Sequence, residues 1–429
     1  LDNVAIPRAP AAGQRYLGLM YDRTASAKAM AIHRATCMLS AAHVTRSQLQ
    51  VASSVPTCFD SMLQLFKVSV EPAGLYGCQI WGLLTLCSAD PAPPDLAALY
   101  RMDHVLEKRR CAILRQWFHL PQSTPSLCML HELGLEPLVH TYVRQAVRWW
   151  NCLVAMPDAS PYKAALRQNV ADGVQGWACN FSGALYKCMR TVLQAQGHMQ
   201  SQLAQSLRGL EPFDTEVVDA ALQQRYAEHV LSLEGTYFRS YFAGMQSHVV
   251  GELPCWYSFA VSHGVLLRVL KFRLGRSSVR VNVGRYTQPA LPRAQRTCQR
   301  CHLVCLPQQQ VPVDDENHCL LDCACPALTA SRERVIAAVR RVWRTAPLNT
   351  AKQFFEAIDH LQAKRAHREK HKCVFFVAKC FKEAFACVRD PVGYCEVEPE
   401  YSLSQFFDDF NSDDVLQACD VLADVITDH

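Results

Sequence analysis

The chain has 429 residues, of which 50% are hydrophobic and 19% are charged, and its formal net charge is +5. This composition is typical of a large globular protein and argues against a disordered chain. No run of apolar residues reaches the roughly 18 needed to span a bilayer, and the first residues lack the charged and then apolar order of a signal peptide. We therefore expect an intracellular protein, nuclear or cytoplasmic, that does not enter a membrane.

The pattern of apolar residues predicts a mainly α-helical chain. A short hairpin is expected at the N-terminus, with a turn at residues 12–14 and its second strand at residues 16–22. Asp95 is expected to cap a helix that continues to Trp117. Residues 266–283 mix Leu and Val with Arg and Gly, and short strands are expected there. Further helices are expected over residues 24–48, 59–70, 135–154, 214–244, 331–344 and 351–390.

The charged residues are distributed unevenly. Residues 396–429 contain ten acidic residues and no Lys or Arg, so the rest of the chain is strongly basic. Between Arg268 and Arg300 there are nine Lys or Arg and no Asp or Glu, and a second basic run covers residues 364–372. Clusters of this kind are typical of surfaces that bind a polyanion.

Most of the cysteines are expected to be ordinary reduced side chains. There are 21 of them in a large chain without an export signal, so most are expected to be reduced. Cys373, Cys380 and Cys387 recur every seven residues in a helical pattern rich in Phe and Ala. This spacing places them on one face of a helix, where we expect them to be small buried side chains of the core.

A cysteine and histidine motif is the strongest chemical signal in the sequence. Cys298 and Cys301 form a C-x2-C pair, and His318 and Cys323 follow in an H-x4-C arrangement. This spacing brings three thiolates and an imidazole to one point, where they complete a tetrahedron around Zn²⁺. Four protein ligands leave no open position, so the expected zinc is structural.

Two alternatives to this site stay open at this point. The cysteines can be free thiols in a Cys-rich chain, or a different quartet can form, with Cys325 as the best substitute for Cys323. The basic residues Arg296 and Arg300 favour the metal site, because a nearby positive charge keeps thiols ionised.

No catalytic residue is predicted. Nucleotidyl transfer requires carboxylates on adjacent strands that hold two Mg²⁺ ions. Residues 406–409 have the pattern aromatic-x-Asp-Asp, but they lie in the acidic tail, and no partner Asp on a strand is recognisable. Residues 314–316, Asp-Asp-Glu, are interpreted as an exposed loop inside the zinc motif. No phosphate-binding Gly loop, HExxH or GxSxG motif is present.

Four short blocks follow one another along the chain. Residues 15–22 read Arg-Tyr-Leu-Gly-Leu-Met-Tyr-Asp, and residues 66–82 end in Tyr-Gly-x-x-x-Trp-Gly. Residues 106–134 contain Pro-Gln-Ser-Thr-Pro and then Glu-Leu-Gly. Residues 272–326 combine Phe-Arg-Leu-Gly, Gly-Arg, the Cys/His motif and Cys-Pro. In this order the blocks resemble the C-terminal half of the reverse transcriptases of non-LTR (LINE-type) retrotransposons.

The resemblance implies part of an RNA-directed DNA polymerase. In that family the catalytic aromatic-x-Asp-Asp lies upstream of the Tyr-Leu-Gly strand, and this chain begins too late to contain it. We therefore expect a fragment that binds RNA or an RNA/DNA duplex and the rest of the polymerase upstream, with no small-molecule substrate and no activity alone. The implied organisation is the end of a palm (1–23), a helical thumb (24–155), a helical linker region (156–265), a basic zinc-binding module (266–330), C-terminal helices (331–395) and an acidic tail (396–429).

Basic and aromatic residues in these blocks are the candidate nucleic-acid contacts. Lys108, Arg109 and Arg115 lie away from the apolar face of their expected helix, where they can bind phosphates in a salt-dependent way. The preferred template contacts are arginines beside the zinc turn. The candidate set is Tyr16, Lys108, Arg109, Arg115, Arg273, Arg276, Arg280 and Arg285.

A function of a different class stays open. A helical scaffold or zinc-dependent adaptor that binds another protein fits the same sequence, with residues 401–429 as a helix for the partner. The two functions differ in their salt dependence, because binding to phosphates weakens as salt increases. A pseudogene product that never folds is a third possibility.

Overall fold

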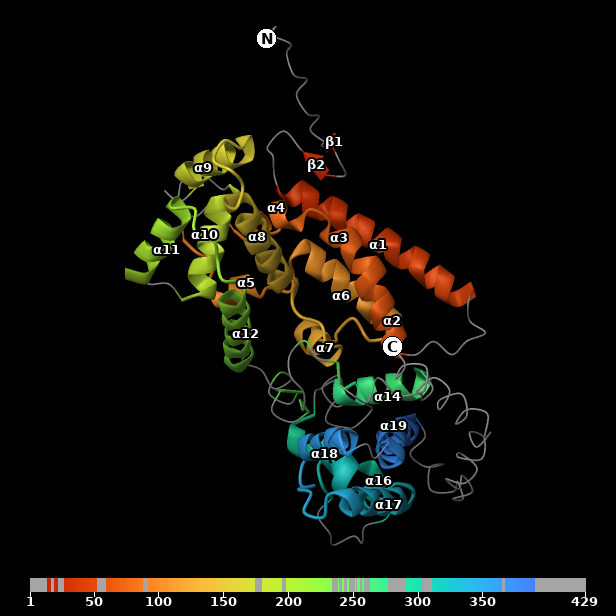
Figure 1. Cartoon of the computed structure of the whole chain (residues 1–429). Helices are drawn as coiled ribbons and strands as arrows, with labels where there is room; N and C mark the ends of the chain where they lie inside the picture. Colours follow the sequence, from red (N-terminus) through yellow and green to blue (C-terminus); the bar gives the residue numbers. More distant parts are fainter. Residues whose placement is uncertain are drawn as a thin grey trace, which may run out of the picture. The chain divides into compact units, whose positions relative to one another are not determined.

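Helices dominate the part of the chain that the computed structural model describes (Figure 1). The prediction of a mainly α-helical chain is therefore confirmed. The described residues are 14–16, 19–21, 27–51, 59–87, 92–173, 180–194, 198–233, 263–276, 291–302, 304, 311–364 and 367–389, with scattered positions between 238 and 257.

The chain divides into two compact units. Unit 1 comprises Leu1–Val55, Ser61–Phe242 and His248–Leu253. Unit 2 comprises Pro56–Asp60, Ala243–Ser247 and Pro254–His429. The Cys/His motif therefore lies within a single unit, and its surroundings can be described from unit 2 alone.

The N-terminal strands pair differently from the predicted hairpin. Strands β1 (Gln14–Tyr16) and β2 (Leu19–Tyr21) are antiparallel, with Gln14 opposite Tyr21 and Tyr16 opposite Leu19. The chain thus reverses between Tyr16 and Leu19, within the segment that was expected to be one strand. The turn expected at residues 12–14 lies largely outside the described residues.

Unit 1 is built from helices packed on a shared apolar core. Helix α1 packs on α3 and α6, α8 packs on α4 and α12, and α10 packs on α9 and α11. The elements of unit 1 are α1 Ala27–Val51, α2 Phe59–Leu65, whose first two residues belong to unit 2, η1 Phe66–Val70, α3 Glu71–Leu75, α4 Cys78–Trp81, η2 Leu83–Thr85, α5 Leu96–Leu99, α6 Val105–Trp117, α7 Ser126–Glu132, α8 Leu138–Val154, α9 Pro161–Gly173, α10 Phe181–Val192, α11 His198–Arg208 and α12 Thr215–Ser232.

The expected helix from Asp95 to Trp117 is interrupted. Asp95 does cap a helix, because its side chain accepts from the backbone N–H of Ala98, but α5 ends at Leu99 and α6 begins at Val105. Between them the Tyr100 hydroxyl bonds the imidazole of His140 and the carbonyl of Leu222. Contacts with distant elements thus end the first helix, and they cannot be read from local propensity.

The Tyr-Gly-x-x-x-Trp block forms a tight turn. Gly77 has φ 74°, a left-handed conformation that a residue with a Cβ rarely adopts, and it precedes α4. At the end of α4 the indole N–H of Trp81 donates back to the carbonyl of Tyr76 at 3.2 Å. Glycine and tryptophan are therefore required at these positions for local structural reasons.

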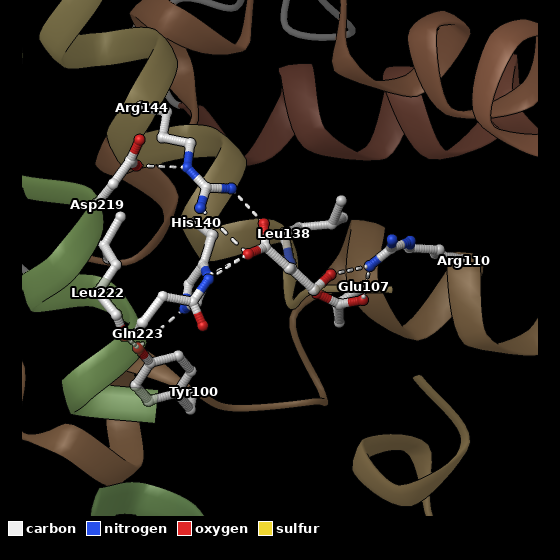
Figure 2. A network of polar contacts seen from close by, with 10 residues as sticks. Tyr100, Glu107, Arg110, Leu138, His140, Arg144, Asp219, Leu222 and Gln223 are labelled. Carbon is white, nitrogen blue, oxygen red and sulfur yellow. Dashed lines mark hydrogen bonds and ion pairs between the residues drawn. The ribbon is translucent and has the colours of Figure 1, made fainter. Parts of the chain in front are cut away.

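A polar network crosses the interior of unit 1 (Figure 2). The carboxylate of Glu136 accepts hydrogen bonds from Arg144 and from Gln223 on α12, and Arg144 also pairs with Asp219 at 2.6 Å. The network links the start of α8 to α12. Further along, buried Arg110 pairs with Glu71 and Glu107 and donates to the carbonyl of Glu136, while Glu107 accepts from the N–H of Leu138.

Unit 2 is organised around its longest helix. Helix α19 packs on α14, α17, α18 and η5. Cys373 and Cys380 on α19 are fully buried, as their spacing predicts; the side chain of Cys387 lies outside the described residues. The bounds are α14 His263–Arg273, η4 Arg293–Gln295, α16 Gln299–His302, η5 His318–Asp322, α17 Pro326–Val342, α18 Ala351–Ala363 and α19 His367–Arg389.

The short strands expected over residues 266–283 are replaced at their start by a helix. Leu266, Val269 and Leu270 are buried at helical spacing on α14, which packs on α19. Residues 277–290 lie outside the described part of the chain. Among the described residues near the zinc motif, the extended structure amounts to one isolated bridge between Thr297 and Val313.

Candidate metal centre

The two cysteines of the C-x2-C pair are fixed by a narrow backbone ladder. Thr297 bridges Val313, the N–H of Cys298 donates to the carbonyl of Pro312 at 2.9 Å, and the N–H of Asp314 donates to the carbonyl of Arg296 at 2.8 Å. Cys301 then lies on α16, the short helix that follows. The turn between them directs both thiols to the same side.

The second pair of ligands lies on one wide helical turn. Element η5 is a π-helix, in which the N–H of Cys323 donates to the carbonyl of His318 five residues earlier at 2.7 Å. The side chain of Asp315 accepts from the N–H of His318 at 2.9 Å and so holds the start of this turn. A five-residue spacing therefore places His318 and Cys323 on one face.

All four predicted ligands converge in the interior of unit 2. The ligand atoms of Cys298, Cys301, His318 and Cys323 lie within 4.8 Å of one another, and all four side chains are buried. The Sγ of Cys323 is 3.9 Å from each of the other two Sγ atoms, and Nε2 of His318 is 3.3 Å from the Sγ of Cys301. This arrangement can hold one metal ion. Within the described residues, it is the one cluster in which at least three metal-binding side chains lie close enough to bind the same ion.

Hydrogen bonds within this cluster shift the pKa values of its thiols and its imidazole. Hydrogen bonds with Cys298 and Cys301 lower the pKa of the Cys323 thiol below its ordinary value. Burial opposes the charged form of His318, but hydrogen bonds with Cys301 and Cys323 outweigh it and raise the pKa of His318 to about 9. A metal ion that binds here must displace protons from the thiols and the imidazole, so its affinity must fall as the pH falls.

Two buried arginines make polar contacts with the segments that carry the ligands. Arg300, within the C-x2-C pair, is 1% exposed and forms an ion pair with Asp314, which is also buried. Arg332 on α17 donates from Nε to the carbonyl of Leu320 at 2.8 Å and from Nη2 to the carbonyl of Cys323 at 2.9 Å. Arg300 is therefore paired with a carboxylate, and Asp314 is not in an exposed loop as expected, because it pairs with this buried guanidinium.

The nearby cysteines belong to other contacts. Cys325 is buried but stands at the start of α17, outside the cluster, so it does not substitute for Cys323. Cys319 faces away from the cluster, and its Sγ contacts the carbonyl of Cys380 on α19 at 3.8 Å. The alternative quartet is therefore not formed.

The predicted nucleic-acid contacts in unit 1 have different surroundings. Lys108 and Arg109 on α6 are exposed. Arg115 is half-buried and donates to the carbonyl of Thr124 and to the hydroxyl of Ser126, so it holds the loop before α7. Tyr16 lies in β1, and its side chain is outside the described residues.

Arg273 is not a surface contact. Its side chain is 1% exposed, and its guanidinium lies over the ring of Phe355 on α18 with 4.1 Å to the centroid. This packing removes it from any phosphate, which corrects its assignment as a template contact. Arg276 follows α14 and is half-buried, while Arg280 and Arg285 lie outside the described residues.

Helix α17 carries exposed arginines that were not among the predicted nucleic-acid contacts. Arg334, Arg340 and Arg341 are exposed, and Arg344 is exposed just beyond the helix. Arg334 and Arg341 are seven residues apart, which places them on one side of α17, and Arg344 follows three residues later, beyond the end of the helix. This spacing in the sequence could have predicted a basic helix face, but the denser basic runs at residues 268–300 and 364–372 were the stronger signal.

No protein-family model, curated protein or solved structure matches the chain. In the part of the chain that the structure describes, no helix is both long and apolar enough to cross a membrane.

Proposed function

We propose that this chain is a zinc-organised, nucleic-acid-binding region of an RNA-directed DNA polymerase of the non-LTR retrotransposon type. The observation that carries the proposal is the convergence of Cys298, Cys301, His318 and Cys323, in the order that the fourth sequence block requires. The proposal assigns no catalytic residue to these 429 residues.

The donor set fits zinc. Three sulfurs and one imidazole nitrogen are soft and intermediate ligands, which bind Zn²⁺ in tetrahedral structural sites. Zinc bound here supplies a rigid cross-link between the C-x2-C turn and η5 rather than a reactive position, because the protein provides all four ligands.

The exposed cations support nucleic acid as the ligand. On unit 2 they include Arg334, Arg340, Arg341 and Arg344, which follow the metal motif in sequence, and on unit 1 they include Lys108 and Arg109. Such side chains bind phosphates regardless of base sequence, and each contact releases counterions. An RNA/DNA duplex is therefore the proposed ligand for both units, with the remainder of the polymerase as the protein partner.

The proposal is tested by salt-dependent duplex binding. The zinc-loaded full chain is titrated with a fluorescent RNA/DNA duplex between about 50 and 200 mM salt, a range over which multiple phosphate contacts weaken affinity strongly. We expect the logarithm of the affinity to fall linearly with the logarithm of the salt concentration. Substitution of Arg340 and Arg344 by Ala is expected to reduce the slope by about 1 for each lost phosphate contact.

A matched control distinguishes the loss of specific phosphate contacts from the loss of net positive charge. Arg167 is exposed on α9 and is already paired with Asp158, so Arg167→Ala removes one positive charge without removing a free cation. This variant is expected to bind as the wild type does. Absence of binding at low salt, or binding that does not change with salt, contradicts the proposal and leaves the zinc-dependent adaptor as the function to test.

A further inference from the structure

Two cysteines of unit 1 that are distant in sequence have their thiols in contact. The Sγ atoms of Cys87 and Cys188 are 3.7 Å apart. Cys188 lies on α10 and is fully buried, whereas Cys87 follows η2 and is half-buried. The Sγ of Cys87 also lies 3.7 Å from the carbonyl of Ala184, one turn before Cys188. The packing of η2 on α10 fixes this pair.

The surroundings give the two thiols different reactivities. The hydrogen bond with Cys188 lowers the pKa of Cys87 and outweighs burial, which raises it, and the positive charge of the buried Lys187 adds to the lowering. The same hydrogen bond, together with burial, raises the pKa of Cys188. A partly accessible thiol whose pKa is lowered, next to a second thiol that can attack it, is the arrangement that reacts with oxidants and is then resolved as a disulfide.

We propose that Cys87 and Cys188 form a modification site for hydroperoxides, at which oxidation produces a reversible disulfide between the residue after η2 and helix α10.

The reaction balances with one hydroperoxide and two thiols. The thiolate of Cys87 attacks the peroxide, so that a sulfur–oxygen bond forms, the oxygen–oxygen bond breaks, and the leaving oxygen takes a proton as an alcohol or water. Cys188 then attacks the sulfur of the Cys87 sulfenic acid, and a disulfide forms as hydroxide leaves and takes the proton of Cys188 to become water. Two electrons pass from the two thiols to the peroxide.

The geometry permits this bond. The two sulfurs need to approach from 3.7 Å to about 2.05 Å, which is the step from a van der Waals contact to a disulfide. The bond closes a loop of about one hundred residues and therefore restricts the unfolded chain strongly. The oxidised protein should melt at a higher temperature than the reduced protein, and a dithiol should reverse the change.

Peptide mapping tests the proposal on the wild-type chain. The zinc-loaded full chain is treated with hydrogen peroxide, remaining thiols are alkylated, and tryptic peptides are identified by mass spectrometry. We expect the peptide containing Cys87 to be joined to that containing Cys188. Because Cys78 lies in the same tryptic peptide as Cys87, fragmentation must assign the linked sulfur. Recovery of Cys87 as an alkylated thiol or as an overoxidised acid, without the link, overturns the proposal.

Two variants provide independent evidence. In Cys188→Ser the resolving thiol is missing, so Cys87 should accumulate as a sulfenic acid that dimedone traps. Cys152 is an exposed free cysteine of the same unit, and Cys152→Ser should leave the yield of the link unchanged. A link that disappears in Cys152→Ser, or no dimedone adduct on Cys87 in Cys188→Ser, contradicts the assigned order of attack.

Discussion

At the scale of single residues, the metal centre distinguishes two cysteines that are almost adjacent. The thiol of Cys323 lies in the cluster, while Cys325, also buried, lies outside it. Cys323→Ala should lower zinc affinity by more than the roughly 10–100-fold that loss of an outer hydrogen-bond partner costs, because a direct ligand is removed. Cys325→Ala should keep one zinc per chain. Zinc stoichiometry and the absorption of the cobalt-substituted protein measure both outcomes.

The control in this comparison is matched in residue type and burial. Both variants remove a buried thiol within the same short segment, so any difference in metal content reflects ligation and not general damage. Equal zinc loss in both variants would argue against the Cys298, Cys301, His318 and Cys323 set.

The ligands could be predicted from the sequence because their geometry is local. A C-x2-C turn and one helical turn each fix two ligands through nearby backbone hydrogen bonds. The burial of Arg273 could not be predicted, because it depends on Phe355, a residue of a different helix far along the chain. The burial of Asp314 depends likewise on the guanidinium of Arg300.

At the scale of elements, Arg332 connects η5 to α17. Its guanidinium is buried and donates to the carbonyls of Leu320 and Cys323. Arg332→Met should lower the free energy of unfolding of unit 2 by on the order of 3 kcal/mol, because the buried carbonyls of Leu320 and Cys323 lose a charged donor. It should also weaken zinc binding by roughly 10–100-fold, as loss of an outer partner does. Denaturant titration and chelator competition measure the two effects.

The neighbouring Arg334 supplies the comparison. It lies on the same helix but is exposed, and it bonds the carbonyl of Ala330 within that helix. Arg334→Met should change stability by no more than about 0.5 kcal/mol. If both variants retain wild-type zinc affinity, Arg332 does not position the metal-binding turn.

The Glu136 network makes the attachment of α8 to α12 dependent on pH. Burial alone would raise the pKa of Glu136, but hydrogen bonds from His140 and Arg144 outweigh it and hold this pKa well below its ordinary value. The carboxylate therefore stabilises unit 1 above the unfolded-state pKa of about 4.3, and this stability is lost as the pH falls toward the folded-state value. Glu136→Gln should destabilise the chain by on the order of 2 kcal/mol at neutral pH.

The difference between wild type and Glu136→Gln should shrink as the pH is lowered from about 5 to 3, since the carboxyl takes up a proton in the unfolded chain there while it stays ionised in the folded chain. Metal loss at low pH affects both proteins and cancels in the difference. Exposed Glu216 on α12 provides the control, because Glu216→Gln should show a small difference at every pH. A constant deficit of Glu136→Gln across this range would show that its effect is steric. Urea unfolding at each pH gives the values.

Element boundaries show where local reasoning reaches its limit. The helical spacing of Phe59, Met62, Leu63, Phe66 and Val70 predicted an apolar stripe, and all but Met62, which is half-buried, are buried. The break between α5 and α6 was not predictable, because it rests on bonds from Tyr100 to residues of α8 and α12. Helix α14 was missed for a similar reason, since its buried face is defined by α19.

At the scale of the whole molecule, the two compact units depend on metal to different degrees. Unit 1 has its own apolar core and the Glu136 network, and its described residues include no metal-binding group of three or more ligands. In unit 2 the metal motif contacts α17 through Arg332 and α19 through Cys319. Zinc should therefore contribute to the stability of unit 2 and leave that of unit 1 unchanged.

Metal removal with hydrogen exchange tests this division. Treatment with ortho-phenanthroline under reducing conditions should increase amide exchange in η5, α17 and α19, because binding free energy at a structural zinc site is folding free energy. Exchange in α6 and α8 should stay within error of the zinc-loaded protein. The meta isomer, which does not chelate, controls for adsorption of the aromatic compound. Added Zn²⁺ should restore protection while Mg²⁺ should not, since Mg²⁺ prefers oxygen ligands. Uniform loss of protection over both units, or none in η5, would contradict a metal that organises unit 2.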